Sequence, residues 1–162
     1  MSSKKHNTQQ KSFVIRTFPS LSQIETVLSN IAQKNNTSLQ LSILGKLTTN
    51  KSITKKELKK IIVDIKQQLS TVLGKQYQFG YFHNTEIGAL FIAGHLTSTF
   101  INKIDKRKLG SLPTGLIGIF KGLGISTEEI DSFLTALKNE NYCLIIRGES
   151  SILNTLEPML NI

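Results

Sequence analysis

The segment from Gly110 to Gly148 constrains the fold of this chain most, because three patterns follow one another in it. Apolar residues first alternate with glycines, which indicates a closely packed, hairpin-like region. Ser126-Thr-Glu-Glu129 then forms a capping box, in which the serine side chain accepts from the third helical N–H. Apolar residues at helical spacing come next, and Tyr142–Arg147 has the composition of a strand. The segment therefore predicts a helix followed by a strand.

The beginning of the chain has a similar order of strand, cap and helix. Phe13–Phe18 is β-branched and aromatic, which predicts a strand, and Ser20 with Gln23 forms a capping box for a helix over 20–34. Residues 38–47 alternate apolar and polar side chains, which predicts a strand with one buried and one exposed face. Arg16 and Arg147 each close an apolar triplet, and a serine follows four residues later. Two such units favour an α+β fold, a ferredoxin-like β-α-β sandwich with inserted helices.

Length and composition favour a single domain without a membrane span. The chain has 162 residues, which suits one α+β domain over 12–162 preceded by a disordered basic tail over 1–11. No stretch reaches the roughly 18 apolar residues that a spanning helix needs. Cys143 is the only cysteine and lies in an apolar run, which predicts a buried, inert thiol and fits a reducing, cytoplasmic setting.

A lysine-rich helix is expected over 54–73. Thr54 and Glu57 form its capping box, and apolar residues make one stripe along it. The other side carries Lys55, Lys56, Lys59, Lys60 and Lys66. The chain holds 20 Lys and Arg against 11 Asp and Glu, a formal charge of +9. Either this helix face is simply solvated, or it binds an anionic partner such as nucleic acid or a membrane surface.

One aromatic cluster lies near a lysine. Tyr77, Phe79, Tyr81 and Phe82 follow Lys75, in a run whose alternation predicts a strand. The alternation favours a buried sheet face. The other interpretation is an aromatic platform with nearby lysines, which is the arrangement that stacks nucleic-acid bases.

Candidate catalytic and metal-binding residues are few. His83, Glu86 and His95 are near one another in sequence, but the histidines lack the i, i+4 spacing of a helical metal site. Neither a nucleophile nor an orienting partner accompanies His95. We therefore expect no enzyme activity, no metal and no cofactor, and keep a small-ligand pocket around these three residues as a competing hypothesis.

Glycines at 115, 118, 122 and 124 mark the segment before the helix that is expected to begin at Ser126. Gly118 and Gly122 are four apart, the spacing that lets two helices approach closely. This spacing indicates either packing within the monomer or contact with a second copy or a membrane. Gly122-x-Gly124 does not make a nucleotide fingerprint, because no third glycine follows at the right distance.

These residues resemble the bacterial general stress or low-temperature-induced protein family. The matching positions are Gly122-Leu-Gly-Ile-Ser126, Glu128-Glu129 and the strand Leu144-Ile-Ile-Arg147. The pair of glycines usual before the last strand is replaced by Asn139-Glu-Asn141, and the basic helix over 54–73 has the place of an insertion. The resemblance implies a stress-linked bacterial protein and carries over no catalytic residue. We expect a non-catalytic interaction or self-assembly module that forms a homo-oligomer, and the alternative is a basic protein that binds nucleic acid or an anionic membrane surface.

Overall fold

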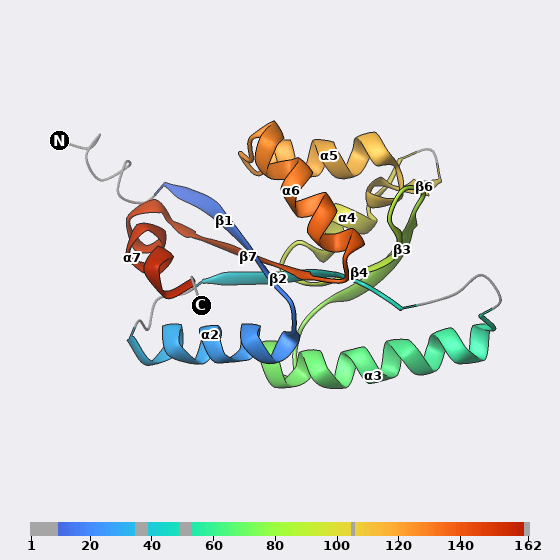
Figure 1. Cartoon of the computed structure of the whole chain (residues 1–162), viewed down its shortest axis with the longest axis horizontal. Coiled ribbons are helices and arrows are strands. Elements are labelled where there is room, and N and C mark those ends of the chain that lie inside the picture. Colours follow the sequence, from blue (N-terminus) through green and yellow to red (C-terminus); the bar gives the residue numbers. More distant parts are fainter. Residues whose placement is uncertain (1–9, 35–38, 49–52, 105, 161–162) are drawn as a thin grey trace.

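A computed structural model of the chain describes residues 10–34, 39–48, 53–104 and 106–160, and the fold is built on a five-stranded antiparallel sheet (Figure 1). The strand order is β1-β7-β2-β4-β3. The strands are β1 (Lys11–Phe18), β2 (Gln40–Lys46), β3 (Phe79–Asn84), β4 (Gly88–Gly94) and β7 (Tyr142–Glu149). The basic tail expected over 1–11 lies outside the described residues as far as residue 9, and Lys11 already belongs to β1.

Two split β-α-β units are interleaved in this sheet. Strands β1 and β2 are both antiparallel to β7, which lies between them, and α2 (Leu21–Lys34) connects them. Strands β4 and β7 are both antiparallel to β2, which lies between them. The helices within residues 97–138 connect β4 to β7. The mixed α and β composition that the sequence predicted is confirmed by this arrangement.

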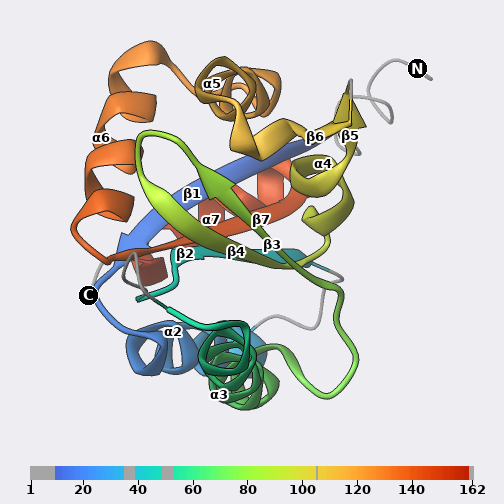
Figure 2. The ribbon, with the colours of Figure 1, turned by 90° about the vertical axis from the view of Figure 1, so that its right-hand side faces the viewer.

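Helices cover both faces of the sheet (Figure 2). One face carries α2, α3 (Lys55–Leu73) and α7 (Ser150–Leu160), and the other carries α4 (Thr97–Ile101), α5 (Pro113–Gly122) and α6 (Thr127–Lys138). A short β5 (Lys103–Ile104) and β6 (Arg107–Lys108) pair and a single 3-10 turn (Leu109–Ser111) precede α5. The result has three layers, and the ferredoxin-like β-α-β sandwich with inserted helices that we expected is not confirmed.

The core is therefore divided into two parts by the sheet. Ile43, Leu144 and Ile146 face the α2, α3 and α7 side, whereas Leu44 and Ile145 face the α4, α5 and α6 side. The prediction of an exposed face for the strand over 38–47 is wrong in its centre, because Ser42 through Gly45 are buried. Ser42 tolerates burial because its Oγ accepts from the Leu96 amide at 2.8 Å.

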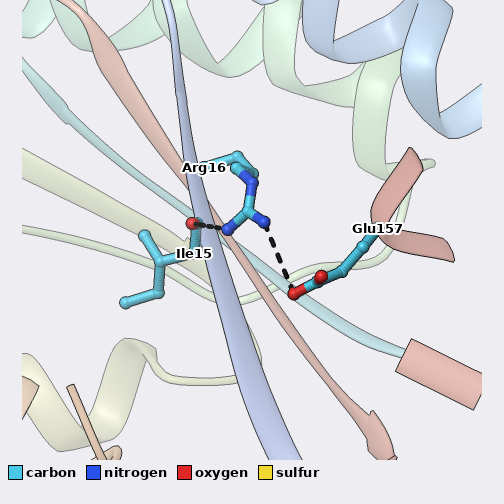
Figure 3. Close-up of polar contacts among 3 residues, drawn as sticks. All are labelled: Ile15, Arg16 and Glu157. Atoms are coloured by element: carbon cyan, nitrogen blue, oxygen red, sulfur yellow. Dashed lines mark hydrogen bonds and ion pairs between the residues drawn. The ribbon is translucent and has the colours of Figure 1, made fainter. Parts of the chain in front are cut away.

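The repeated strand-arginine-serine pattern has a structural counterpart in β1 and β7. These strands pair with Arg16 opposite Leu144 and with Arg147 opposite Phe13, so the two arginines occupy equivalent places about a local twofold axis. The helices that follow, α2 and α7, lie on the same face of the sheet. Arg16 donates to the Ile15 carbonyl at 2.9 Å and pairs with Glu157 of α7 at 3.5 Å (Figure 3). This pair ties α7 to the edge strand β1.

The three expected capping boxes supply helix N-caps. The side chains of Ser20, Thr54 and Ser126 accept from the amides of the residues three further on, at 3.1–3.3 Å. The Ser126 hydroxyl also donates to the Glu129 carboxylate at 3.0 Å, a second contact between the cap and the third helical residue. The hairpin-like region expected before Ser126 is instead the helix α5, which begins at Pro113, a residue favoured in the first helical turn.

Candidate functional site

The three residues of the small-ligand hypothesis do not meet. His83 pairs with Ala89 in the β3–β4 hairpin, and His95 lies six residues beyond Ala89, past the far end of β4. Six strand residues span about 20 Å. His83 and His95 therefore lie at opposite ends of the hairpin and cannot line one pocket. Among the described residues, no group of three or more His, Cys, Asp or Glu side chains is placed to hold a metal ion.

Cys143 is buried in the centre of the sheet, on the α5 and α6 side. Burial raises the pKa of its thiol to about 12. Since the thiolate is the nucleophilic form, this cysteine is inert in the folded protein, as its apolar neighbours predicted.

An apolar hollow lies along α5. It has a volume of about 600 Å³ and is open to solvent. Its walls come from β1, α4, the turn before α5, and α5 itself: Phe13, Leu96, Thr99, Leu109, Leu112, Thr114, Gly115, Gly118, Ile119, Gly122 and Leu123. We call this hollow the α5 groove.

The glycines at 115, 118, 122 and 124 have different structural roles. Gly115 is buried, and a Cβ there would collide with the carbonyl oxygen of Leu109, so Gly115 lets the preceding turn pack directly on α5. Gly124 has a φ of +88°, a left-handed conformation that glycine adopts without strain, and it links α5 to α6. These two glycines serve the fold of the single chain.

Gly118 and Gly122 instead face open space. Both are exposed, both line the α5 groove, and a Cβ added at either would meet no atom within 4 Å. Packing within the monomer therefore does not account for them. Their spacing exposes a strip of helix backbone that nothing in the described chain covers.

A positively charged cluster lies beside Phe13, at the border of the α5 groove. The Arg147 guanidinium lies 5.9 Å from the centre of the Phe13 ring, and its Nη1 donates to Gln40 Oε1 at 2.6 Å. Burial lowers the pKa of His95, and the charges of Arg147 and Lys11 lower it further. The lowered pKa favours the neutral form of His95, and the Gln40 side chain that accepts from Arg147 is also neutral.

The lysines predicted to form an anion-binding face are all exposed on α3. None of Lys55, Lys56, Lys59, Lys60 and Lys66 forms an ion pair within the described part of the chain. At the C-terminal part of α3, a second hollow of about 480 Å³ lies between the helix and β3. Lys66 lines it together with Lys75, Tyr77 and Phe79.

The aromatic run does not form a buried face as its alternation predicted. Gly80, Phe82 and Asn84 are the buried positions of β3, whereas Phe79 is half-buried and Tyr81 is 41% exposed. The buried face of this strand is thus the one that packs on α4, where Phe82 stacks on Phe100.

Asn84 is an important residue that the sequence analysis missed. It is 1% exposed, its Oδ1 accepts from the amides of Glu86 and Ile87, and its Nδ2 donates to the Gly110 carbonyl at 3.0 Å. It fixes the β3–β4 turn and holds the turn before α5. Asparagine is typical of turns, but no local pattern predicts the bond from Asn84 to Gly110, which is 26 residues away.

Comparisons with protein-family models, with curated proteins and with solved structures gave no match. The resemblance to the bacterial general stress family stays a prediction drawn from the sequence. Within the described residues, no helix is both long enough and apolar enough to cross a membrane.

Proposed function

We propose that this protein is a non-catalytic interaction module that self-associates through the α5 groove. The observation that supports this proposal is the open space beside Gly118 and Gly122. Two helices can approach closely where both carry small residues four apart, because their backbones then come into van der Waals contact. Among the residues that the structure describes, none packs against Gly118 or Gly122 in this way.

A second copy of the chain is the partner that this surface fits best. The surface carries both a strip of glycines and the half-buried apolar side chains Leu112 and Leu123. In a twofold-symmetric dimer each copy presents the same patch, so each patch must be complementary to itself. A glycine strip flanked by apolar side chains meets that condition when two α5 helices cross, since the side chains of one copy fill the open space of the other.

The proposed setting is a bacterial stress response in the cytoplasm. It rests on the resemblance of Gly122–Ser126, Glu128-Glu129 and the final strand to the stress-protein family.

The test is the oligomeric state of three proteins, measured by sedimentation equilibrium and by light scattering after size exclusion. We expect the wild-type chain to form a dimer, Gly118→Leu to be monomeric, and Ser132→Leu to remain dimeric. Ser132 lies on the exposed side of α6, so this control adds an equal apolar side chain elsewhere. A wild-type monomer up to millimolar concentration, or a dimer that Gly118→Leu leaves intact, would overturn the proposal.

An anionic partner is the second candidate function. It is favoured by the five exposed α3 lysines, none of which pairs with an acid in the described part of the chain. Binding to nucleic acid or to anionic vesicles that weakens steeply with salt would support it, and salt-insensitive binding would count against it.

A further inference from the structure

Strand β3 presents two aromatic rings in sequence at the edge of the sheet. It pairs with β4 only, so no strand of the sheet covers its other edge. Phe79 and Tyr81 are two residues apart and therefore point to the same face, about 7 Å from each other along the strand. That face is the one on which α3 lies, since Phe79 packs in the α2, α3 and α7 part of the core.

Each of the two rings has a lysine over it. Lys66 Nζ lies 5.0 Å from the centre of the Phe79 ring, and Lys108 Nζ lies 4.9 Å from the centre of the Tyr81 ring. Lys108 also donates to the Tyr81 carbonyl at 2.6 Å, which holds this ammonium at the outer edge of β3. The strand edge thus alternates flat apolar rings with positive charges, and Tyr81 is one of the two large apolar side chains that the structure records as exposed.

The hollow beside Phe79 continues this arrangement toward α3. Val63, Lys66, Gln67 and Ser70 form one stripe of the helix, and Lys75, Tyr77 and Phe79 close the other side. The Tyr77 hydroxyl donates to the Lys66 carbonyl at 2.7 Å, which fixes the ring as a wall of the hollow. A volume of about 480 Å³ is within the range of small-ligand pockets, about 300–1,000 Å³. The amide of Gln67 and the hydroxyl of Ser70 supply the donors and acceptors that the edge of a nucleobase needs.

We propose that single-stranded nucleic acid binds along β3. One base stacks on the exposed ring of Tyr81, and the neighbouring base enters the hollow between α3 and the rings of Tyr77 and Phe79. The entering base takes the place of the Lys66 ammonium over Phe79, which frees this lysine for a phosphate. Lys75 and Lys108 contact the neighbouring phosphates.

Charge and shape together favour a single strand over other anionic partners. The chain carries a formal charge of +9, and the only acids of α3, Glu57 and Asp64, do not line the hollow. Stacking on a protein ring needs unpaired bases, which a duplex does not offer. A membrane surface would contact the lysines, but it would not occupy a polar hollow with aromatic walls.

Fluorescence anisotropy of a labelled twelve-residue oligothymidylate tests the proposal at several salt concentrations. With three phosphate contacts the logarithm of the binding constant should fall with the logarithm of salt concentration with a slope of about −2. Tyr81→Ala should weaken binding roughly 5- to 150-fold, since one stacked base is lost, and should leave this slope unchanged. Lys66→Ala with Lys75→Ala should make the slope shallower by about 1.4.

The matched control is Lys121→Ala with Lys138→Ala, which removes the same charge from α5 and α6, on the opposite side of the sheet. This control should bind within about twofold of wild type after correction for the long-range charge effect. Thermal melting by circular dichroism verifies that each variant is folded.

Several results would overturn the proposal. If the control pair weakens binding as much as the Lys66 and Lys75 pair does, binding depends on net charge alone. The same conclusion follows if duplex DNA binds as tightly as the single strand. If the protein binds tightly to anionic phospholipid vesicles and Tyr81→Ala does not change this binding, the surface binds a membrane. If thymidine monophosphate displaces the oligonucleotide at an equal concentration of nucleotide, the hollow binds a free nucleotide and not a strand. The proposal is independent of self-association, because Gly118→Leu should bind the oligonucleotide as the wild type does.

Discussion

Gly115 and Gly118 lie on the same helix, and substituting each by alanine should have opposite effects on stability. At Gly118 the added Cβ meets no atom within 4 Å, and the position is exposed. Alanine has less backbone freedom than glycine in the unfolded chain, so less conformational entropy is lost on folding. This difference stabilises the folded monomer by about 1 kcal/mol. At about 2.1 cal/mol/K of unfolding entropy per residue, a chain of this length gains about 3 °C in Tm.

At Gly115 the same methyl group meets the backbone of the preceding turn. The ideal Cβ collides with the Leu109 carbonyl oxygen and lies 2.9 Å from Leu109 Cδ1. Relieving such a collision by moving backbone costs about 1–3 kcal/mol. Since the gain in helix propensity is no larger than at Gly118, Gly115→Ala should melt about 3–9 °C below Gly118→Ala.

The assay is a thermal melt followed by circular dichroism at several protein concentrations. Dilution separates the stability of the monomer from that of a dimer, because only the latter depends on concentration. If both variants melt at the same temperature in dilute solution, or if Gly118→Ala melts below the wild type there, the geometry that we assign to α5 is wrong.

Three further outcomes follow from buried or perturbed groups. Asn84→Ala should destabilise the protein by about 1–3 kcal/mol, because the Gly110 carbonyl and two turn amides lose their partner; urea unfolding measures this loss, and an unchanged midpoint would contradict it. Burial and the charge of Arg147 lower the pKa of His95, so the unfolded state binds more protons as pH falls through about 6.5 and stability decreases there. NMR titration should show the His95 midpoint below that of a free histidine and partly restored in Arg147→Gln, and an unshifted midpoint would refute the assignment. Cys143 should resist iodoacetamide at pH 8 until the protein is unfolded by urea, as mass spectrometry can record, whereas alkylation of the folded chain would show that the thiol is accessible.

Local patterns in the sequence were sufficient to predict most helices and strands. The capping boxes at Ser20, Thr54 and Ser126 involve residues three apart, so the hydrogen bonds that they form depend on the helix start alone. The strands around Ile15 and Ile145 are short apolar runs that have no competing helical period.

The helix α5 could not be predicted in the same way. Its glycines disfavour a helix by about 1 kcal/mol each, and the compensating term is the burial of Leu116 and Phe120 against the sheet. That burial is a property of the tertiary structure. The contrast between Gly115 and Gly118 has the same origin, since it depends on the position of the Leu109 carbonyl.

Continuous apolar runs in the sequence could have predicted that helices cover both faces of the sheet. The central strands contain the runs Leu90–Ala93 and Cys143–Ile146, which are buried at every position. Continuous apolar runs of this kind are typical of strands covered on both faces, whereas a strand with one exposed face alternates. The insertion of β7 between β1 and β2 pairs residues about 130 positions apart, and no local pattern specifies it.

Disulfide cross-linking of Gly118→Cys tests the central claim of self-association most directly. Two α5 helices that cross at their glycines bring the two introduced thiols within the Cα separation of about 7 Å that a disulfide allows. Cys143 is the only native cysteine and is buried, so it contributes no background, and Ser132→Cys provides an exposed thiol on α6 for comparison. Our account predicts that mild oxidation converts Gly118→Cys to a covalent dimer at micromolar concentration and leaves Ser132→Cys monomeric. A Gly118→Cys chain that stays monomeric, or that cross-links no faster than Ser132→Cys, would contradict it.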